Sequence, residues 1–210
     1  MDHGRFVIFG TGGLARELTT WLESCGRTVE GYVTTAPEQH GKYGLPGSIL
    51  DEGRPSNTPG LIAIGDPMVK QTVFERASTN GWRFGSFVHP SALLGARVAL
   101  APGTFIGPNC TLSIDIRIGL CSFVNFGCGV GHDVTIDDFV QINPGVQIGG
   151  NCKIGRNTLV GSGTTIIEAT AVGQYCVIGS GSVIYGQVRD GAHMIAALSR
   201  RARAFEKGQG

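Results

Sequence analysis

The sequence predicts a Rossmann-like α/β domain at the N-terminus, then a left-handed parallel β-helix, and a short C-terminal helix. The β-helix prediction rests on a repeat: from Val88 to Arg189 every sixth residue is a branched aliphatic, over 17 consecutive hexads without an insertion. The N-terminal prediction rests on a buried strand, a glycine-rich turn and an amphipathic helix that follow one another. Because the pattern changes after Phe84, we expect two domains, of residues 1–85 and 86–210.

The N-terminal domain is expected to alternate strands and helices, the order that gives a parallel sheet. Glycine and proline punctuate the predicted elements and dominate the long connection after the second strand. The expected strands are Arg5–Phe9, Thr28–Val33, a short one around Gly47–Leu50, and Leu61–Gly65, and the expected helices are Leu14–Cys25 and Pro67–Asn80.

Each hexad of the repeat is expected to form one short strand and one corner, so that three hexads close a triangular coil. The aliphatic residue points inward, and the fifth residue of each hexad is small or β-branched, which suits a narrow interior. The second residue is often Gly, Asn or Asp, as at Gly107 and Gly131. We expect these second residues to adopt the backbone conformations of the tight corners.

Charge and hydropathy limit the classes of partner. The formal net charge is +1, which gives no reason to expect nucleic acid or an anionic membrane surface. No apolar run reaches the length of a membrane span, and the first residues do not resemble a signal peptide, so we expect a cytoplasmic protein without membrane insertion.

The cysteines and histidines do not predict a metal site. Four of the six cysteines occupy the small fifth position of their hexads, and no Cys-x-x-Cys pair occurs, which indicates packing and not metal or disulfide chemistry. Only His89 and His132 lie within the repeat, too few for a three-histidine zinc site. No metal is therefore expected.

The turn after the first strand is a candidate phosphate-binding loop. Gly10, Gly12 and Ala15 match the relaxed dinucleotide fingerprint, in which backbone amides approach a phosphate at a helix N-terminus. An NAD site would require an acidic residue at the end of the second strand, where this chain has Thr34 and Thr35. A single nucleotide or a nucleotide-sugar fits better, and a tight turn needed only for packing is the alternative without a ligand.

His132 is the candidate general base. It takes the third position of its hexad, on the outer surface, and Gly150 follows it by 18 residues, one coil further on. An imidazole beside an unobstructed backbone N–H suits acyl transfer, because the base accepts a proton and the amide stabilises an oxyanion. Asp133 is a candidate to orient the imidazole, although in an extended strand its side chain would point elsewhere. A solvated surface histidine is the alternative.

The chain resembles the sialic-acid and bacillosamine-type sugar O- and N-acetyltransferases. The resemblance rests on the Gly10–Gly13 turn, on Ala63-Ile64-Gly65-Asp66, on His89-Pro90-Ser91-Ala92, on Asn125 with His132-Asp133, and on the hexads. It implies acetyl-CoA as co-substrate, a nucleotide-sugar acceptor and a homotrimer with active sites between subunits. His132 and Asp133 would be catalytic. Gly10, Gly12, Gly13, Gly65 and Asn125 would bind the acceptor, and Gly150, Ser162, Gly163, Ser180 and Gly181 would bind acetyl-CoA.

Several positions depart from the family pattern. Leu14 stands where the family commonly has histidine after the double glycine, Thr34 where acidic residues are common, and Gln141 where many members carry a second histidine. The C-terminal Arg200, Arg201 and Arg203 are candidates to bind the 3′-phosphate of CoA, or they form a solvated basic face.

Three classes of function remain. The preferred hypothesis is direct transfer of an acetyl group from acetyl-CoA to the amine of a nucleotide-linked amino-deoxy sugar, in surface-glycan or glycoprotein biosynthesis. No acyl-enzyme is expected, because no cysteine or serine stands in a nucleophile arrangement. The alternatives are O-acetylation of a sialic-acid-like or other hydroxyl acceptor, and a non-enzymatic β-helix scaffold or binding module.

Overall fold

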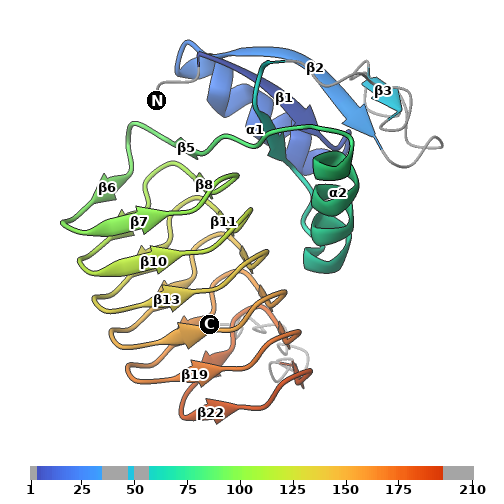
Figure 1. Ribbon diagram of the computed structural model, residues 1–210. Coiled ribbons are helices and arrows are strands. Elements are labelled where there is room, and N and C mark those ends of the chain that lie inside the picture. The colour runs from blue at the N-terminus through green and yellow to red at the C-terminus, as the bar shows by residue number, and fades with distance from the viewer. Residues whose placement is uncertain (1–3, 35–46, 50–56, 196–210) are drawn as a thin grey trace, which may run out of the picture.

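A computed structural model describes residues 4–34, 47–49 and 57–195. A small α/β part, formed by the first elements, sits on one end and one side of a long parallel β-helix (Figure 1). The expected C-terminal helix lies outside the described residues, as do Arg200, Arg201 and Arg203.

The α/β part contains a four-stranded parallel sheet and two helices, fewer than a complete Rossmann domain has. The strand order is β3-β2-β1-β4. The predicted elements are confirmed within a few residues at their ends, and the last strand ends three residues earlier than expected (at Ile62 in place of Gly65). The elements are β1 (Arg5–Phe9), α1 (Gly13–Ser24), β2 (Thr28–Thr34), β3 (Gly47–Ile49), β4 (Gly60–Ile62) and α2 (Pro67–Thr79).

The two helices cover opposite faces of this sheet, and alternation along β1 is the reason. Phe6 and Ile8 point to one face, where they pack with Leu18 of α1. Val7 and Phe9 point to the other face, where they pack with Val73 of α2. A strand that is apolar on both faces needs a helix on each side, so this short hydrophobic run dictates a layered α/β arrangement.

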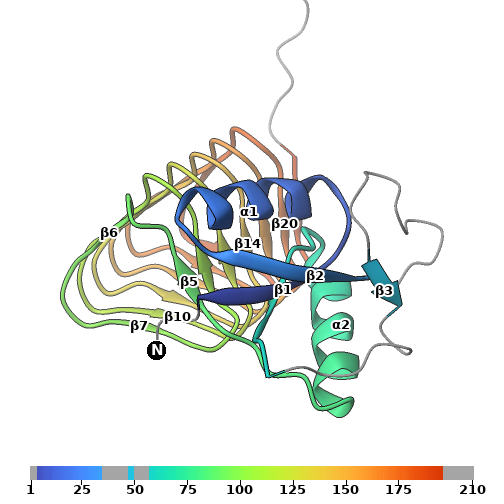
Figure 2. The same cartoon turned by 90° about the horizontal axis from the view of Figure 1, so that it is seen from above.

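The β-helix is built from three parallel sheets of seven, six and six strands, which meet at three corners (Figure 2). Sheet I contains β5 (Phe87–Val88), β8 (Phe105–Ile106), β11 (Phe123–Val124), β14 (Gln141–Ile142), β17 (Leu159–Val160), β20 (Val177–Ile178) and β23 (His193–Met194). Sheet II contains β6 (Leu93–Leu94), β9 (Thr111–Leu112), β12 (Gly129–Val130), β15 (Gln147–Ile148), β18 (Thr165–Ile166) and β21 (Val183–Ile184). Sheet III contains β7 (Val98–Leu100), β10 (Ile116–Ile118), β13 (Thr135–Ile136), β16 (Lys153–Ile154), β19 (Ala171–Val172) and β22 (Gln187–Val188).

The interior of the β-helix is filled as the hexads predict. Val124 pairs with Ile142 and Ile142 with Val160, so equivalent aliphatic residues stack 18 positions apart. The fifth positions are also buried, and Cys110, Cys128, Cys152 and Cys176 are free thiols there. Several buried hydroxyl groups at this position donate to the backbone of the coils: Thr158, for example, donates to the Gly173 carbonyl at 2.9 Å. This satisfies the hydroxyl without water.

The expected reason for the second-position glycines is wrong. Gly107 and Gly131 have no left-handed backbone; left-handed φ values fall at the fourth position of the hexads, for example 56° at Asp133. At Gly107 and Gly131 glycine is needed because the next coil passes close by. A Cβ on Gly131 would lie 2.6 Å from the Gly150 nitrogen, which is a steric clash.

The repeat ends differently from the prediction. In the last coil Val188 pairs with Val172, 16 residues earlier, and Met194 pairs likewise with Ile178. The corner after Ile184 is therefore two residues shorter, and Val188 is a strand residue and not the fifth residue of a hexad. The β-helix continues for one more strand after Arg189, β23, which ends at Met194.

Aromatic rings join the α/β part to the outer face of sheet I. Phe87, Phe105 and Phe123 lie one coil apart and stack, with ring centroids 5.7 and 4.4 Å apart. Trp21 of α1 stacks on Phe105 at 5.7 Å, and Phe6 of β1 meets Phe87 edge to face. Because both parts contribute to this apolar cluster, the division at residues 85 and 86 stays a prediction.

Below the rings, α2 is fixed to the β-helix by polar contacts. Lys70, with 0% of its surface exposed, donates from Nζ to Gln141 Oε1 at 2.9 Å and to the Val140 carbonyl at 3.5 Å. Asn157 Nδ2 donates to the Pro67 carbonyl at 3.2 Å. Burial lowers the pKa of Lys70 to about 7, although Cys121 and Asp66 act to raise that pKa.

The lowered pKa of Lys70 should make the stability of the protein depend on pH. The unfolded lysine keeps its proton up to about pH 10, whereas the folded one releases it above about 7, so the unfolded state binds more protons. The free energy of unfolding should therefore rise with pH above 7, with a limiting slope of about 1.4 kcal/mol per pH unit. Urea unfolding of wild type and Lys70→Met from pH 6.5 to 8 measures it, since histidine contributions cancel in the difference. Equal slopes would contradict a buried lysine that titrates.

Candidate functional site

A cavity of about 310 Å³ lies at the carboxyl end of the four-stranded sheet. It brings together Gly10, Gly12, Gly13 and Gly65, four of the five residues expected to bind the acceptor. Its other walls come from the ends of β2 and β4 and from both helices: Thr11, Leu14, Val33, Thr34, Ala63, Ile64, Val69 and Val73. Ligands of open parallel sheets bind at this edge, so the location suits a small-molecule site.

The shape of this cavity depends on glycine. Gly10 has a φ of 123°, and a Cβ there would lie 2.8 Å from the Ala63 carbonyl oxygen, so no other residue fits. Gly12 is the N-cap of α1 and has no side chain to accept from the first amides of the helix. Those amides face a cavity, an arrangement that favours an anionic group.

His132 lies at the corner between sheets II and III, beside Gly150 of the next coil. Its Nδ1 is 2.9 Å from Asp133 Oδ2. The sequence interpretation assumed an extended backbone at Asp133, and this assumption is wrong. The φ of 56° at Asp133 turns the carboxylate back along the corner, so that it reaches the ring. The imidazole and the carboxylate are half exposed, at 50% and 55%. The contact engages Nδ1 and leaves Nε2 on the side of Gly150.

Gly150 provides the space for this ring. A Cβ on Gly150 would lie 2.7 Å from Nε2 and Cε1 of His132, so the imidazole lies directly across the glycine. Within the described chain, the Gly150 nitrogen donates no backbone hydrogen bond, whereas the next amide, that of Asn151, donates to the His132 carbonyl at 2.8 Å. The corner therefore combines a base with a backbone N–H that has no backbone partner among the described residues.

The remaining expected residues lie at another corner, between sheets I and II. Ser162 and Ser180 are stacked one coil apart on the surface, and the Gly181 nitrogen donates to the Ser162 carbonyl at 2.8 Å. Gly163 and Gly181 have left-handed φ values of 67° and 70°. Asn125 is 4% exposed at the same corner, and its Oδ1 accepts from the Phe126 nitrogen at 2.8 Å. Within one chain, sheet II separates this group from His132.

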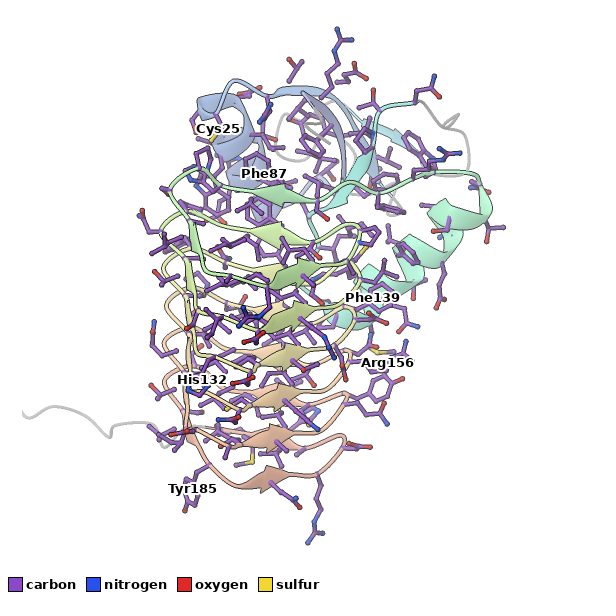
Figure 3. The ribbon with its side chains drawn as sticks, turned by 60° about the vertical axis from the view of Figure 1, so that its left-hand side comes forward. Cys25, Phe87, His132, Phe139, Arg156 and Tyr185 are labelled. Atoms are coloured by element: carbon purple, nitrogen blue, oxygen red, sulfur yellow. The ribbon has the colours of Figure 1, made fainter. Side chains whose placement is uncertain are left out.

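The glycine-rich cavity is also remote from His132. Figure 3 shows His132 on the edge of the β-helix opposite α2, and α2 forms one wall of the cavity. The expected residues thus form three groups on a single chain: the cavity, the His132 corner and the serine–glycine corner.

Sequence reasoning overlooked Lys70, the one lysine among the buried residues of the described part of the chain. A signal was present, because the buried residues of α2 are Pro67, Lys70, Val73 and Ala77, at the spacing of one helix face. A lysine at an inward position of such a stripe needs a polar partner, which Gln141 supplies. Among the described residues no group of three potential metal ligands occurs, and no helix is long and apolar enough to cross a membrane.

Comparisons with known proteins agree with the fold. Residues 151–186 match the model for bacterial transferase hexapeptide repeats. No curated protein shows a significant match in sequence. Perosamine N-acetyltransferase from Caulobacter crescentus, solved as a histidine mutant with CoA and GDP-perosamine, is 25% identical, with a TM-score of 0.81 over 93% of this chain and 95% of that one.

Two further solved structures are similar over most of their length. PerB from Caulobacter crescentus, in complex with CoA and GDP-perosamine, is 26% identical, with a TM-score of 0.78 over 90% of this chain and 92% of that one. The acetyltransferase domain of PglB from Neisseria gonorrhoeae is 22% identical, with a TM-score of 0.70 over 91% and 96%, and supports the fold alone. The left-handed β-helix and the acyltransferase class expected from the sequence are thereby confirmed.

The His132 corner generates a prediction that needs no substrate. Gly150→Ala should force the imidazole away from the corner, because its new methyl group would overlap the ring. Long-range ¹H–¹⁵N spectra of the histidine rings should then show a shift for His132 alone. Gly31→Ala is the matched control, since a Cβ on Gly31 meets nothing within 4 Å. His132 resonances that are unchanged in Gly150→Ala would contradict the described contact.

Proposed function

We propose that this hexapeptide-repeat acyltransferase transfers the acetyl group of acetyl-CoA to the amine of a nucleotide-linked amino-deoxy sugar. The observation that carries the proposal is the arrangement of His132 between Asp133 and Gly150. Nδ1 donates to the Asp133 carboxylate, so Nε2 carries the lone pair of the neutral imidazole. A base is thus held next to a backbone N–H, the two groups that acyl transfer requires.

In the proposed reaction the amine attacks the thioester carbonyl directly. His132 Nε2 accepts the proton that the nitrogen loses, and the Gly150 N–H donates to the oxyanion as it develops. Asp133 stabilises the imidazolium that forms. Collapse of the tetrahedral intermediate breaks the C–S bond, and the thiolate of CoA takes up the proton from His132. Ser162, Gly163, Ser180 and Gly181 are assigned to acetyl-CoA.

The N-terminal cavity is proposed to bind the nucleotide-sugar, within a Rossmann-like domain of residues 1–85. The helix N-terminus at Gly12 and Gly13 suits a diphosphate, and Gly65 faces it across the cavity. Asn125 is assigned to the sugar. The likeness to enzymes solved with CoA and GDP-perosamine, over about nine tenths of both chains, supports a nucleotide-linked amino sugar as the acceptor.

We further propose a homotrimer with active sites between subunits. Support comes from the single chain, in which the cavity and His132 lie on different sides of the β-helix. A sugar held by one cavity is remote from the base of the same chain, whereas a neighbouring subunit can present its own base. Light scattering should give three times the chain mass of 22.0 kDa. An active monomer would contradict the shared site.

The function is tested by CoA release with a panel of UDP-, GDP- and dTDP-linked amino-deoxy sugars and free sialic acid. One amino sugar should turn over, and His132→Ala should lower kcat by about 10²- to 10⁴-fold, the usual contribution of a general base. Asp133→Asn should lower it less, because it keeps the base. His193→Ala, on the last coil, is the matched control.

Each other outcome has a defined meaning. Turnover with sialic acid alone would replace the N-acetyl proposal by O-acetylation with the same base. Turnover that His132→Ala leaves intact would contradict the assignment of the base. A folded protein without turnover on any acceptor would contradict the proposed substrate class.

A further inference from the structure

A chain of amide hydrogen bonds leads from the buried Lys70 to the surface at the corner between sheets I and II. Lys70 Nζ donates to Gln141 Oε1 at 2.9 Å. Gln141 Nε2 in turn donates to Asn143 Oδ1 at 3.2 Å. Lys70 and Gln141 are buried, with 0% and 1% of their surfaces exposed, whereas Asn143 is half-buried. The chain of bonds therefore ends at the solvent boundary.

The direction of these hydrogen bonds is fixed at the buried end. Below a pH of about 7, where Lys70 is mainly an ammonium group, it has donors and no acceptor, so it requires the oxygen of the Gln141 amide. Among the described residues, the other polar neighbour bonded to Nζ is the Val140 carbonyl, which is also an acceptor. With its oxygen turned to Lys70, Gln141 has only N–H groups to offer Asn143, and Asn143 must turn its oxygen inward. Its Nδ2 group then faces outward as a donor, and it has no partner among the described residues.

Asn143 lies between the two groups of residues assigned to substrates. Its position in the hexad is that of Asn125 one coil above, since Val124 pairs with Ile142. One coil below, Ile142 pairs with Val160, which precedes Gly161 and Ser162. A donor at this corner can meet either the acceptor sugar or acetyl-CoA, both of which carry hydroxyl, carbonyl and phosphate oxygens.

We propose that Lys70 and Gln141 are positioning residues, which hold the Asn143 amide with its N–H groups outward to bind an oxygen atom of a substrate. The proposal rests on the proposed function and adds a binding residue and its two supports to it. It also gives a role to Gln141, where related chains often have histidine, because its amide accepts from the lysine and donates to Asn143.

Two variants test the direction of the chain of bonds. Gln141→Glu keeps an acceptor for Lys70 but also accepts from Asn143, so the Asn143 amide should reverse and turn its oxygen outward. Asn143→Asp removes the outward donor directly. Each should raise the KM for one substrate on the order of tenfold, because an oxygen then faces an oxygen. kcat at saturation should stay near the wild-type value in both variants, as expected for a contact that only binds. Tm should stay near the wild-type value in Asn143→Asp, which leaves the buried pair of Lys70 and Gln141 unchanged.

Gln187→Glu, on the exposed strand β22, makes the same chemical change away from the corner and is the matched control. Measuring the KM for acetyl-CoA and for the amino sugar separately identifies which substrate supplies the oxygen. KM values equal to those of the control in both variants would overturn the proposal. So would a KM increase in Asn143→Asp with a parallel fall in its Tm, which would indicate a structural role.

Failure of the proposed function is distinguishable from failure of this inference. A wild-type protein that neither binds CoA in calorimetry nor turns over any acceptor overturns the proposed function. An active wild type whose two variants match the control overturns only the inference about Asn143.

Discussion

The in-register stacking of 18-residue coils constrains almost every other feature of this protein. Backbone hydrogen bonds run between successive coils, so each residue has a fixed neighbour 18 positions before and after it. An aliphatic strand residue must therefore recur in each hexad, and a bulky second-position residue is excluded where the next coil passes close by. Where the spacing shortens to 16, at Val188, the helix is within one strand of its described end.

The same register creates the candidate active site. His132 and Gly150 are neighbours only because one coil separates them, and the missing side chain of Gly150 leaves room for the ring. This pair could be predicted from the sequence, since counting by 18 requires no knowledge of side-chain positions. The contact with Asp133 could not, because it depends on a left-handed backbone at a residue that is not glycine. The shortened last corner could not be predicted either, because Val188 suits two positions. It fits the fifth position of an uninterrupted hexad, and it also fits the strand position that follows a corner two residues shorter.

The α/β part is attached through contacts that no repeat encodes. Phe87, Phe105 and Phe123 sit at equivalent positions of sheet I and form an apolar surface for Trp21 and Phe6, and Gln141 continues that column as a polar residue. The lysine that meets Gln141 lies 71 positions earlier in the chain, so the sequence offered the helical spacing of Lys70 but not its partner. α2 consequently links the glycine-rich cavity to the β-helix.

The central claim is that acetyl transfer takes place at the corner that carries His132 and Gly150. A crystal structure with CoA bound tests it most directly. If acetyl transfer takes place at this corner, the sulfur atom of CoA will lie beside His132 Nε2, with the Gly150 nitrogen directed at the position of the thioester carbonyl. CoA bound with its sulfur on another face of the β-helix, away from this corner, would contradict the assignment of His132 and Gly150 to catalysis.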